Sequence, residues 1–228
     1  GLMSNQVDDY QALYPDATNA IIAGGTAGLF TLNNIPNTDA AGATNTQQYA
    51  FQFGVPVDSG TSAFDVRFRL LGAVFNSDPV ADQSQGMYIG TGDQDNFVKL
   101  ALHANNGNGG LQVLHESSGA IVSETIYPFS LDGVNSIDLM ITVDPASGTV
   151  QPKAESDIGA VIGVGEPIQL TGALLDAVQS STNALAAGLI SSAGSGPSFN
   201  ATWSEAEVTH QVAEVNVAPA FAAVDSQT

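Results

Sequence analysis

The sequence predicts an all-β protein, built as a two-sheet antiparallel sandwich with at most one short helix. Three observations lead to this fold class. Apolar and polar residues alternate with a period of two in many short runs, which is typical of half-buried strands. Clusters of Gly, Asn, Asp and Ser separate these runs, and helical periodicity is nearly absent. The 228 residues are enough for one sizeable β-domain.

The strands are predicted from these alternating runs, taken in chain order. They span residues 48–57, 62–71, 86–92, 96–104, 110–116, 121–129, 136–144, 149–156, 184–192 and 198–208. The connection VDPASGTVQ has a clear turn mechanism, because Pro145 fixes φ and Gly148 tolerates a positive φ. Similar connectors, DQDN, NNGNGG and ESSGA, join the strands before it.

The single predicted helix lies in the stretch TGALLDAVQSS, residues 171–181. Thr171 is placed to cap its N-terminus. Leu174, Leu175 and Val178 fall on one face, so this face is expected to pack on the sandwich.

The chain divides into three predicted parts. Residues 20–210 form the sandwich domain and residues 1–19 a lead segment. Residues 211–228 change character and predict a linker into a following domain. In this tail, Asn216, Pro219 and Phe221 resemble the opening of cadherin-like or immunoglobulin-like repeats of bacterial surface proteins.

The composition excludes several classes of function. A net charge of −19 would repel nucleic acid and anionic membrane surfaces. Carboxylates at this density are best tolerated at high salt or beside calcium, although ordinary solubilising surface charge also accounts for them. The absence of cysteine excludes disulfides, thiol catalysis and Cys-based zinc sites.

Several strands in order resemble the concanavalin A-like lectin/glucanase superfamily. The segments are AFDVRFRL, GMYIGTGDQDNFVKLAL, GLQVLHE, IDLMITVDPASGTVQ and GSGPSFNATWSEAEV. They look most like non-catalytic modules of bacterial secreted glycosidases and adhesins. The resemblance implies a jelly-roll of two antiparallel sheets, one of them concave. It also implies ligands on the concave face or its rim loops, sometimes beside calcium.

The catalytic motif of the glucanases in this superfamily is incomplete. Those enzymes carry E-x-D-x-x-E on one strand, and here Glu155 and Asp157 are followed by Ala160 in place of the second glutamate. Glu205 and Glu207 lie roughly 6.6 Å apart along a strand, near the separation of paired glycosidase carboxylates, but such pairs are usually solvated. We therefore predict that the chain is not an enzyme.

The cations occupy the polar faces of predicted strands. Arg67 and Arg69 share one face of FDVRFRL, while Lys99 and His103 lie on the outward face of FVKLALH. If these strands belong to one sheet, the cations converge on one surface. That surface is then either cross-strand pairs with Asp65 and Asp138 or a polar groove for a glycan.

The aromatic residues divide into two groups. Phe199 and Trp203 share a face of FNATW and are expected in the core. Tyr88 and Phe97 lie at hairpin ends, where they are expected to stack on a sugar. Together with Asn105 and the cations above, they belong to the predicted ligand-binding set.

A calcium site is predicted in the loop before residue 97. Asp93, Asp95 and Asn96 supply oxygen ligands, and Asn105 and Asn106 follow one hairpin later. Asn106 also belongs to the predicted ligand-binding set. The alternative is turn chemistry, because Asp, Asn and Gly are also the residues of tight turns.

These observations predict a non-catalytic, lectin-like carbohydrate-binding or adhesion module of an exported multidomain bacterial protein. The expected partner is a glycan or cell-surface polysaccharide, and the expected location is extracellular or the cell surface. Two alternatives stay open: a structural spacer domain without ligand, and a polysaccharide-cleaving glycosidase or lyase.

Overall fold

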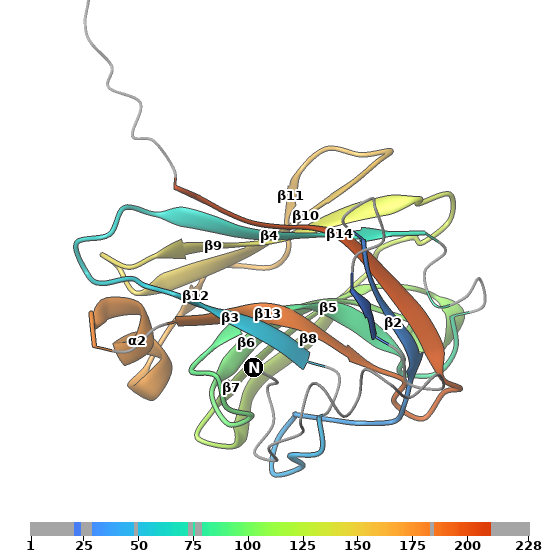
Figure 1. The fold of residues 1–228 in the computed structure, drawn as a ribbon, viewed down its shortest axis with the longest axis horizontal. Helices are drawn as coiled ribbons and strands as arrows, with labels where there is room; N and C mark the ends of the chain where they lie inside the picture. Colours follow the sequence, from blue (N-terminus) through green and yellow to red (C-terminus); the bar gives the residue numbers. More distant parts are fainter. Residues whose placement is uncertain are drawn as a thin grey trace, which may run out of the picture.

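The computed structural model describes residues 21–23, 29–47, 50–72, 75, 79–182 and 185–210. The predicted lead segment 1–19 and linker 211–228 lie outside these residues. The described part is an all-β sandwich of two antiparallel sheets, as predicted, and the sheets form two layers in Figure 1.

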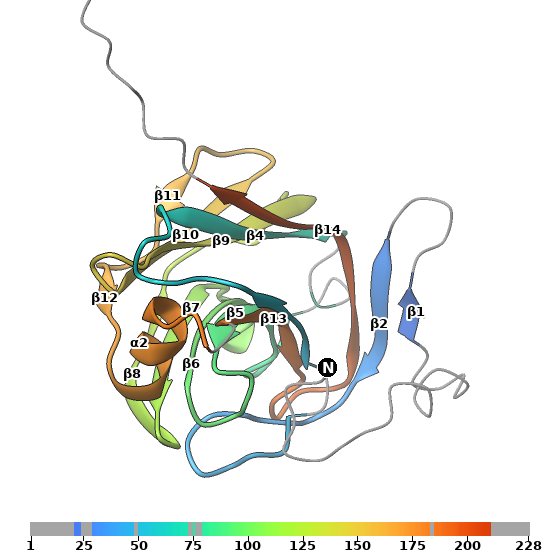
Figure 2. The same cartoon turned by 60° about the vertical axis from the view of Figure 1, so that its left-hand side comes forward.

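The first layer is an eight-stranded sheet with the order β1-β2-β14-β4-β9-β10-β11, in which β12 also pairs with β10. Its strands are β1 (Ile21–Ala23), β2 (Phe30–Ile35), β4 (Phe64–Leu71), β9 (Ser136–Asp144), β10 (Thr149–Ser156), β11 (Ile162–Gly163), β12 (Ile168–Gln169) and β14 (Phe199–His210). Figure 2 shows β2 and β1 beyond β14, at one edge of this sheet.

The second layer is a six-stranded sheet with the order β3-β13-β5-β6-β7-β8. Its strands are β3 (Ala50–Val55), β5 (Ser84–Gly90), β6 (Phe97–His103), β7 (Leu111–Ser117), β8 (Ala120–Tyr127) and β13 (Leu185–Ser192). Every predicted strand overlaps one of the observed strands, with bounds that differ by up to two residues. The short strands β1, β11 and β12, and the longer β2, were not predicted.

The core between the layers follows the predicted alternation. On β4, Phe64, Val66, Phe68 and Leu70 are buried, and the residues between them are only partly buried. Alternate residues of β6 and β9 belong to the same apolar cluster, namely Val98, Leu100, Leu102, Ile137, Leu139, Ile141 and Val143. Burial of one such side chain stabilises the fold by roughly 1.5–3 kcal/mol, so this alternation sets the orientation of each strand.

The central strands of the six-stranded sheet are covered on both faces, which the sequence pattern did not predict, whereas the edge strand β8 is mostly exposed. β5, β6 and β13 are buried at every position. One face packs on the other sheet, and residues 36–47 run across the opposite face, below the sheet in Figure 1. This segment is held by hydrogen bonds from Ala193 N to Pro36 O and from Gln47 Nε2 to Ser191 O.

Residues 36–47 create a second, smaller apolar cluster on the outer face of the sheet. It contains Tyr88 and Phe97 together with Leu114 and Ile190. Tyr88 is 0% exposed and Phe97 1%. Neither ring is therefore open to stack on a sugar, because the segment that follows β2 fills that place.

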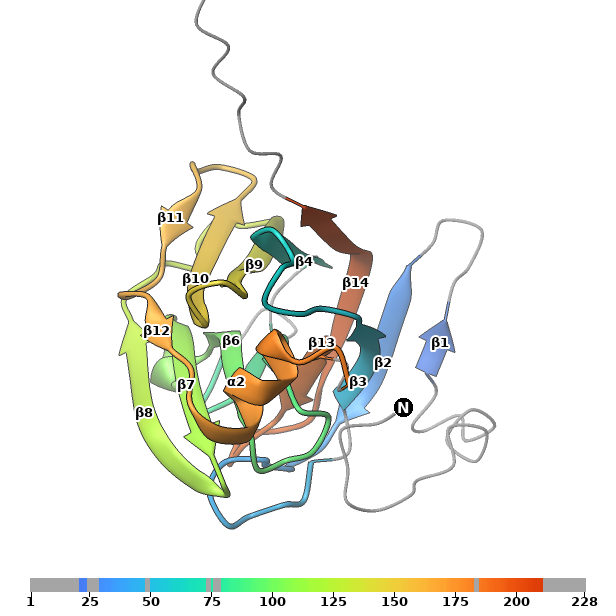
Figure 3. The same cartoon turned by 90° about the vertical axis from the view of Figure 1, so that its left-hand side faces the viewer.

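The predicted helix is present as α2 (Gly172–Gln179), the one α-helix of the described residues. It closes one end of the sandwich (Figures 1 and 3) and buries Leu174, Ala177 and Val178. Thr171 has the extended backbone of an N-cap residue, but its side chain makes no capping hydrogen bond. Packing of the apolar face is thus what holds this short helix in place.

Candidate functional site

The four predicted cationic ligands do not converge on one surface. Arg67 and Arg69 lie on β4 of the eight-stranded sheet, whereas Lys99 and His103 lie on β6 of the six-stranded sheet. The two pairs face outward from opposite layers of the sandwich. The condition for a shared groove, that both strands belong to one sheet, is not met.

Arg67 and Arg69 form cross-strand ion pairs, which is the first of the two arrangements predicted for them. Asp138 on β9 accepts hydrogen bonds from Arg67 Nη1 at 3.2 Å and from Arg69 Nε at 2.7 Å. Glu205 and Glu207 on β14 accept from Arg67 Nη2 at 2.8 and 2.6 Å. Asp65 was the other predicted partner. Its Oδ1 instead lies 3.8 Å from Lys153 Nζ.

This network ties both glutamates of the β14 pair to the arginines of β4. Burial works against the charge of Arg67, but the hydrogen bond to Glu207 and the nearby charge of Asp138 outweigh it and raise its pKa. The hydrogen bond to Asp138 and its charge likewise raise the pKa of Arg69. Glu205 and Glu207 are thus engaged with permanent cations.

Lys99 and His103 line a polar pocket on the outer face of the six-stranded sheet. The pocket has a volume of about 390 Å³. Its walls come from β5 to β8, from residues 37–41 and from the segment around Ser195. The pocket exists because residues 36–47 cover only part of this face, and polar side chains occupy the part left open.

Lys99 is buried in the wall of the pocket, with 9% of its surface exposed. Its Nζ donates to Ser84 Oγ on β5 at 3.1 Å. Burial lowers the pKa of the Lys99 ammonium, while the charges of Asp39 and Glu124 act in the opposite direction. An ammonium has three donors, so Lys99 has hydrogen-bonding capacity left for a ligand.

The tautomer of His103 follows from one hydrogen bond. The backbone N–H of Asn105 donates to His103 Nδ1 at 3.0 Å, so the ring proton of the neutral form is on Nε2. Burial and the nearby charge of Lys99 both lower the pKa of His103, which favours this neutral form at pH 7. His103 therefore contributes an Nε2–H donor.

The acceptors of the pocket are residues that the sequence analysis did not single out. Glu124 Oε1 accepts from Gln112 Nε2 at 2.6 Å, and Asp82 Oδ1 accepts from Ser195 Oγ at 2.7 Å. Gln112 Oε1 and Thr38 Oγ1 are buried without a hydrogen-bond partner. Outward polar positions on β7 and β8 were a usable signal for Gln112 and Glu124, but Thr38 and Asp82 come from loops.

The two predicted asparagines belong to the turn after β6. Asn105 and Asn106 have φ values of 47° and 53°, the left-handed region that asparagine tolerates. Asn105 Nδ2 donates to Gly109 O at 3.2 Å, and the backbone N–H of Asn106 donates to Ala81 O. Asn105 thus acts on the pocket through His103, whereas Asn106 is exposed.

The predicted calcium ligands lie in the turn between β5 and β6. Asp93 Oδ1 accepts from the backbone N–H groups of Asp95 and Asn96, at 2.9 and 3.0 Å. Asp95 Oδ1 accepts from Asn45 Nδ2 at 2.8 Å, and Asn96 Oδ1 from Ser118 N at 2.9 Å. These bonds are turn chemistry, and they join three neighbouring loops. Within the described residues, no group of three or more His, Asp or Glu side chains is arranged to hold a metal ion.

Glu116 is a buried carboxylate beside this turn that sequence reasoning missed. It is 0% exposed, and its Oε2 accepts from the backbone N–H of Gly42 at 2.7 Å. Its Oε1 is buried without a partner. Burial, together with the charges of Asp95 and Asp39, raises the pKa of Glu116 to about 7.

The incomplete glucanase motif lies away from the polar pocket. Glu155 lies opposite Asp138 in the backbone register of β10 and β9, and Asp157 lies in the turn after β10. Asp157 accepts hydrogen bonds from the side chain and backbone of Asn135, which lower its pKa. Neither residue lines the pocket of Lys99 and His103.

Of three comparisons with known proteins, the one with solved structures gives matches, and these concern the fold. No protein-family model matches it, and the comparison with curated proteins gives no significant match. In the part of the chain that the structure describes, no helix has the length and apolar character needed to cross a membrane.

Solved structures of the same fold include a functionally unknown protein from Saccharomyces cerevisiae, with a TM-score of 0.62 and 16% identity over 86% of this chain and 95% of that one. A xylan β-1,4-xylosidase from Bacillus halodurans matches with a TM-score of 0.61 and 15% identity, over 80% of this chain but only 33% of the xylosidase. The seed lectin of Lotus tetragonolobus matches with a TM-score of 0.53 and 13% identity, over 83% and 90% of the two chains. At these identities the likeness shows the fold alone, a lectin-type jelly-roll sandwich.

Proposed function

We propose that the chain is a non-catalytic carbohydrate-binding or adhesion module that holds a glycan in the polar pocket of Lys99 and His103. One observation carries this proposal. The pocket places two donors, the Lys99 ammonium and the His103 Nε2–H, among the carboxylates of Asp39, Asp82 and Glu124. Each sugar hydroxyl both donates and accepts, so a wall of mixed donors and acceptors suits it.

The charges in the pocket favour a neutral glycan. The carboxylates of Asp39, Asp82 and Glu124 outnumber the single ammonium of Lys99, and burial lowers the pKa of His103, which favours its neutral form. An acidic sugar would meet net repulsion here. The aliphatic side chains of Leu114 and Ile121 take the place of an aromatic platform, so hydrogen bonds should dominate and the affinity should be modest.

The setting we propose is an exported, multidomain bacterial protein at the cell surface. Its support is the acidic composition and the absence of cysteine. The lectin named above shares the fold, which makes glycan binding a reasonable use of this sheet.

A glycan screen followed by calorimetry tests the proposal. We expect a neutral oligosaccharide to bind, and Lys99→Met and Glu124→Gln each to weaken binding at least about tenfold, because each removes a charged hydrogen-bonding group. Lys153→Met and Arg69→Ala, both on the opposite sheet, are the matched controls and should leave affinity unchanged. If no glycan binds, the proposal is refuted and the alternative of a spacer domain without ligand is favoured. Binding that survives Lys99→Met and Glu124→Gln would place the site elsewhere.

A second function is a polysaccharide-cleaving enzyme, which the presence of Asp82 and Glu124 in one pocket would serve. Release of reducing sugar or of an unsaturated product separates it from binding alone. Our proposal expects no product to form from the glycan that binds. If a product forms, and its formation stops in Glu124→Gln, the chain is an enzyme and the proposal of a non-catalytic module is wrong.

A further inference from the structure

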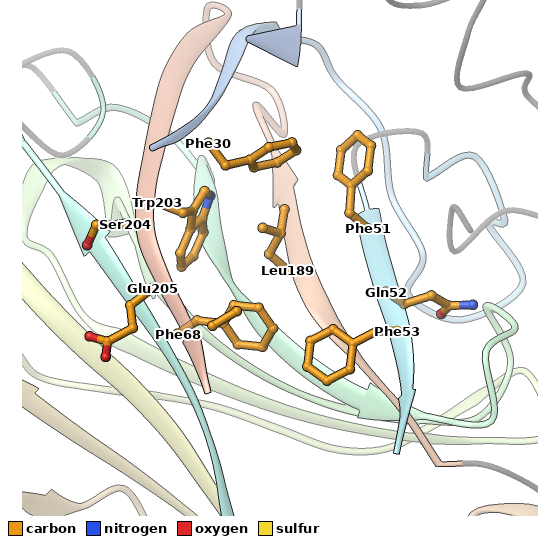
Figure 4. A pocket seen from close by; sticks show the side chains of 10 residues that line it. Phe30, Phe51, Gln52, Phe53, Phe68, Leu189, Trp203, Ser204 and Glu205 are labelled. Carbon is orange, nitrogen blue, oxygen red and sulfur yellow. The ribbon is translucent and has the colours of Figure 1, made fainter. Parts of the chain in front are cut away.

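The polar pocket contains a nucleophilic group that the proposed function uses only as a hydrogen-bond donor. This group is the side-chain amine of Lys99. A different pocket opens between the two sheets and is lined mainly by apolar side chains (Figure 4), and none of the residues that line it carries an amine. Of these two pockets, only the polar one can supply an amine nucleophile.

The pairing of β5 with β6 explains how this amine reaches the polar pocket. Three opposed pairs follow one another on the outer face: Tyr88 with Lys99, Gly86 with Ala101, and Ser84 with His103. The Lys99 Nζ donates to Ser84 Oγ at 3.1 Å, although Ser84 lies two pairs away along this row. The Lys99 side chain therefore extends over the small residues Gly86 and Ala101, and its amine lies at the end of the row that His103 occupies.

Lys99 is buried without an ion-pair partner. It is 9% exposed, and within the described residues its Nζ contacts a hydroxyl rather than a carboxylate. Lys153, the other lysine of the sequence, lies 3.8 Å from Asp65, and its side chain is 28% exposed. Loss of water disfavours an ammonium, so a buried lysine that no carboxylate pairs with releases its proton more readily than an exposed one.

The direction of the Lys99 pKa agrees with this geometry. Burial lowers the pKa of Lys99, and the more distant charges of Asp39, Glu124 and Asp82 do not outweigh that effect. The lowered pKa enlarges the fraction of Lys99 that is free amine at pH 7. The free amine, and not the ammonium, is the nucleophile that attacks a carbonyl carbon.

The surroundings of the amine suit a small carbonyl compound. His103 lines the same pocket and offers its Nε2–H as a donor to a carbonyl oxygen. Leu114 and Ile121 supply aliphatic surface for a short carbon chain. The pocket volume of about 390 Å³ is sufficient for such a molecule.

We propose that Lys99 binds small, uncharged aldehydes covalently, as a reversible imine. The Lys99 nitrogen attacks the aldehyde carbon, and the carbonyl oxygen leaves as water with the two hydrogens of the amine. The aldehyde is uncharged because the carboxylates of Asp39, Asp82 and Glu124 would repel an anion. This reaction takes place in the pocket of the proposed function, but it does not require a glycan to bind there.

Reductive trapping of the imine tests the proposal in the unmodified chain. The protein is incubated at pH 7 with glycolaldehyde and sodium cyanoborohydride, which reduces an imine to a stable secondary amine. Peptide mass spectrometry then measures the rate of alkylation at Lys99 and at Lys153. We expect Lys99 to react at least about fivefold faster, because more of it is free amine. In protein unfolded by guanidinium chloride both lysines are exposed, and their rates should become similar.

Two matched variants of β8 show whether the reaction depends on the pocket. Ile121 lines the pocket and is 46% exposed, so Ile121→Trp should narrow the pocket and slow alkylation of Lys99. Val122 is 60% exposed and does not line the pocket, so Val122→Trp is the control and should react as the parent does. Alkylation of Lys153 should be the same in both variants.

The proposal is overturned if folded protein is alkylated at Lys99 no faster than at Lys153, or if Ile121→Trp and Val122→Trp react equally fast at Lys99. Methyl glycosides, which carry no free aldehyde, separate this proposal from glycan binding. If methyl glycosides do not bind but Lys99 is trapped selectively, the glycan proposal fails and the imine proposal stands. If they bind but Lys99 is not trapped, only the imine proposal fails.

Discussion

Trp203 and Glu205 are two positions apart on β14, yet their side chains lie on opposite faces of the sheet. Trp203 belongs to the apolar core, whereas Glu205 binds Arg67 on the outer surface. The pairing of β14 with β4 shifts between them, so that Trp203 is opposite Leu70 and Glu205 is opposite Arg69. Ser204 is the extra residue of this β-bulge, and it reverses the alternation of the strand.

Deletion of Ser204 should therefore destabilise the protein severely. Without the bulge, either Trp203 leaves the core or Glu205 and Glu207 turn into it. We expect a loss of about 3 kcal/mol or more in the free energy of unfolding, measured by urea denaturation. Ser204→Ala keeps the strand length and should cost less than about 0.5 kcal/mol. Equal stability of the two variants would refute the role of the bulge.

Glu116 should make stability fall as the pH rises. Its folded pKa, raised by burial to about 7, lies above the usual 4.5, so the folded state holds a proton that the unfolded state has released. The contribution of protonated Glu116 to the free energy of unfolding is fully present below about pH 4.5 and is lost as the pH rises through about 7. Glu116→Gln should raise the melting temperature at pH 8 and leave it nearly unchanged at pH 4.5. A uniform shift at both pH values would contradict this assignment.

Calcium should raise the melting temperature if the predicted site at Asp93, Asp95 and Asn96 binds it. The physical reason is that a divalent cation offsets repulsion among Asp93, Asp95 and the neighbouring Glu116, and buried Glu116 Oε1 has no partner. The expected result is a rise of several degrees at millimolar Ca²⁺, reversed by EDTA and absent in Asp95→Asn. Magnesium is the control cation. If neither Ca²⁺ nor EDTA changes the melting temperature, no calcium binds here, and Asp93, Asp95 and Asn96 only stabilise the turn.

Asp138 should contribute more to stability than its partner glutamates. Its side chain is 6% exposed and binds both arginines of β4, whereas the side chain of Glu207 is 45% exposed. Asp138→Asn should cost about 1–2 kcal/mol, because two guanidinium groups lose a buried acceptor charge. Glu207→Gln should cost less than about 0.5 kcal/mol. Similar losses in both variants, measured by chemical denaturation, would show that burial does not set the difference.

The fold was largely predictable because it depends on local periodicity. The alternation in FDVRFRL and SIDLMITV identified β4 and β9 and their buried faces. FTLNNI of β2 was missed because two adjacent asparagines interrupt its alternation. The β-bulge at Ser204 was also invisible, since the residues on both sides of it alternate regularly.

The candidate site was predicted only in part. Outward alternation identified Lys99 and His103, which do line the polar pocket. It could not assign β4 and β6 to different sheets, because strand order depends on pairings distant in the sequence. Thr38, Asp39 and Asp82 come from loops, which carry no periodic signal.

By itself, the sequence determined which residues extend as strands and which side of each strand avoids water, because these choices depend on neighbours within a few positions. The tertiary structure alone decided that residues 36–47 bury Tyr88 and Phe97, that Arg67 and Lys99 occupy opposite layers, and that β3 ends its sheet beside Trp203. Those outcomes depend on contacts between segments far apart in the chain. Such contacts stabilise the protein only after both sheets have formed, so no local pattern predicts them.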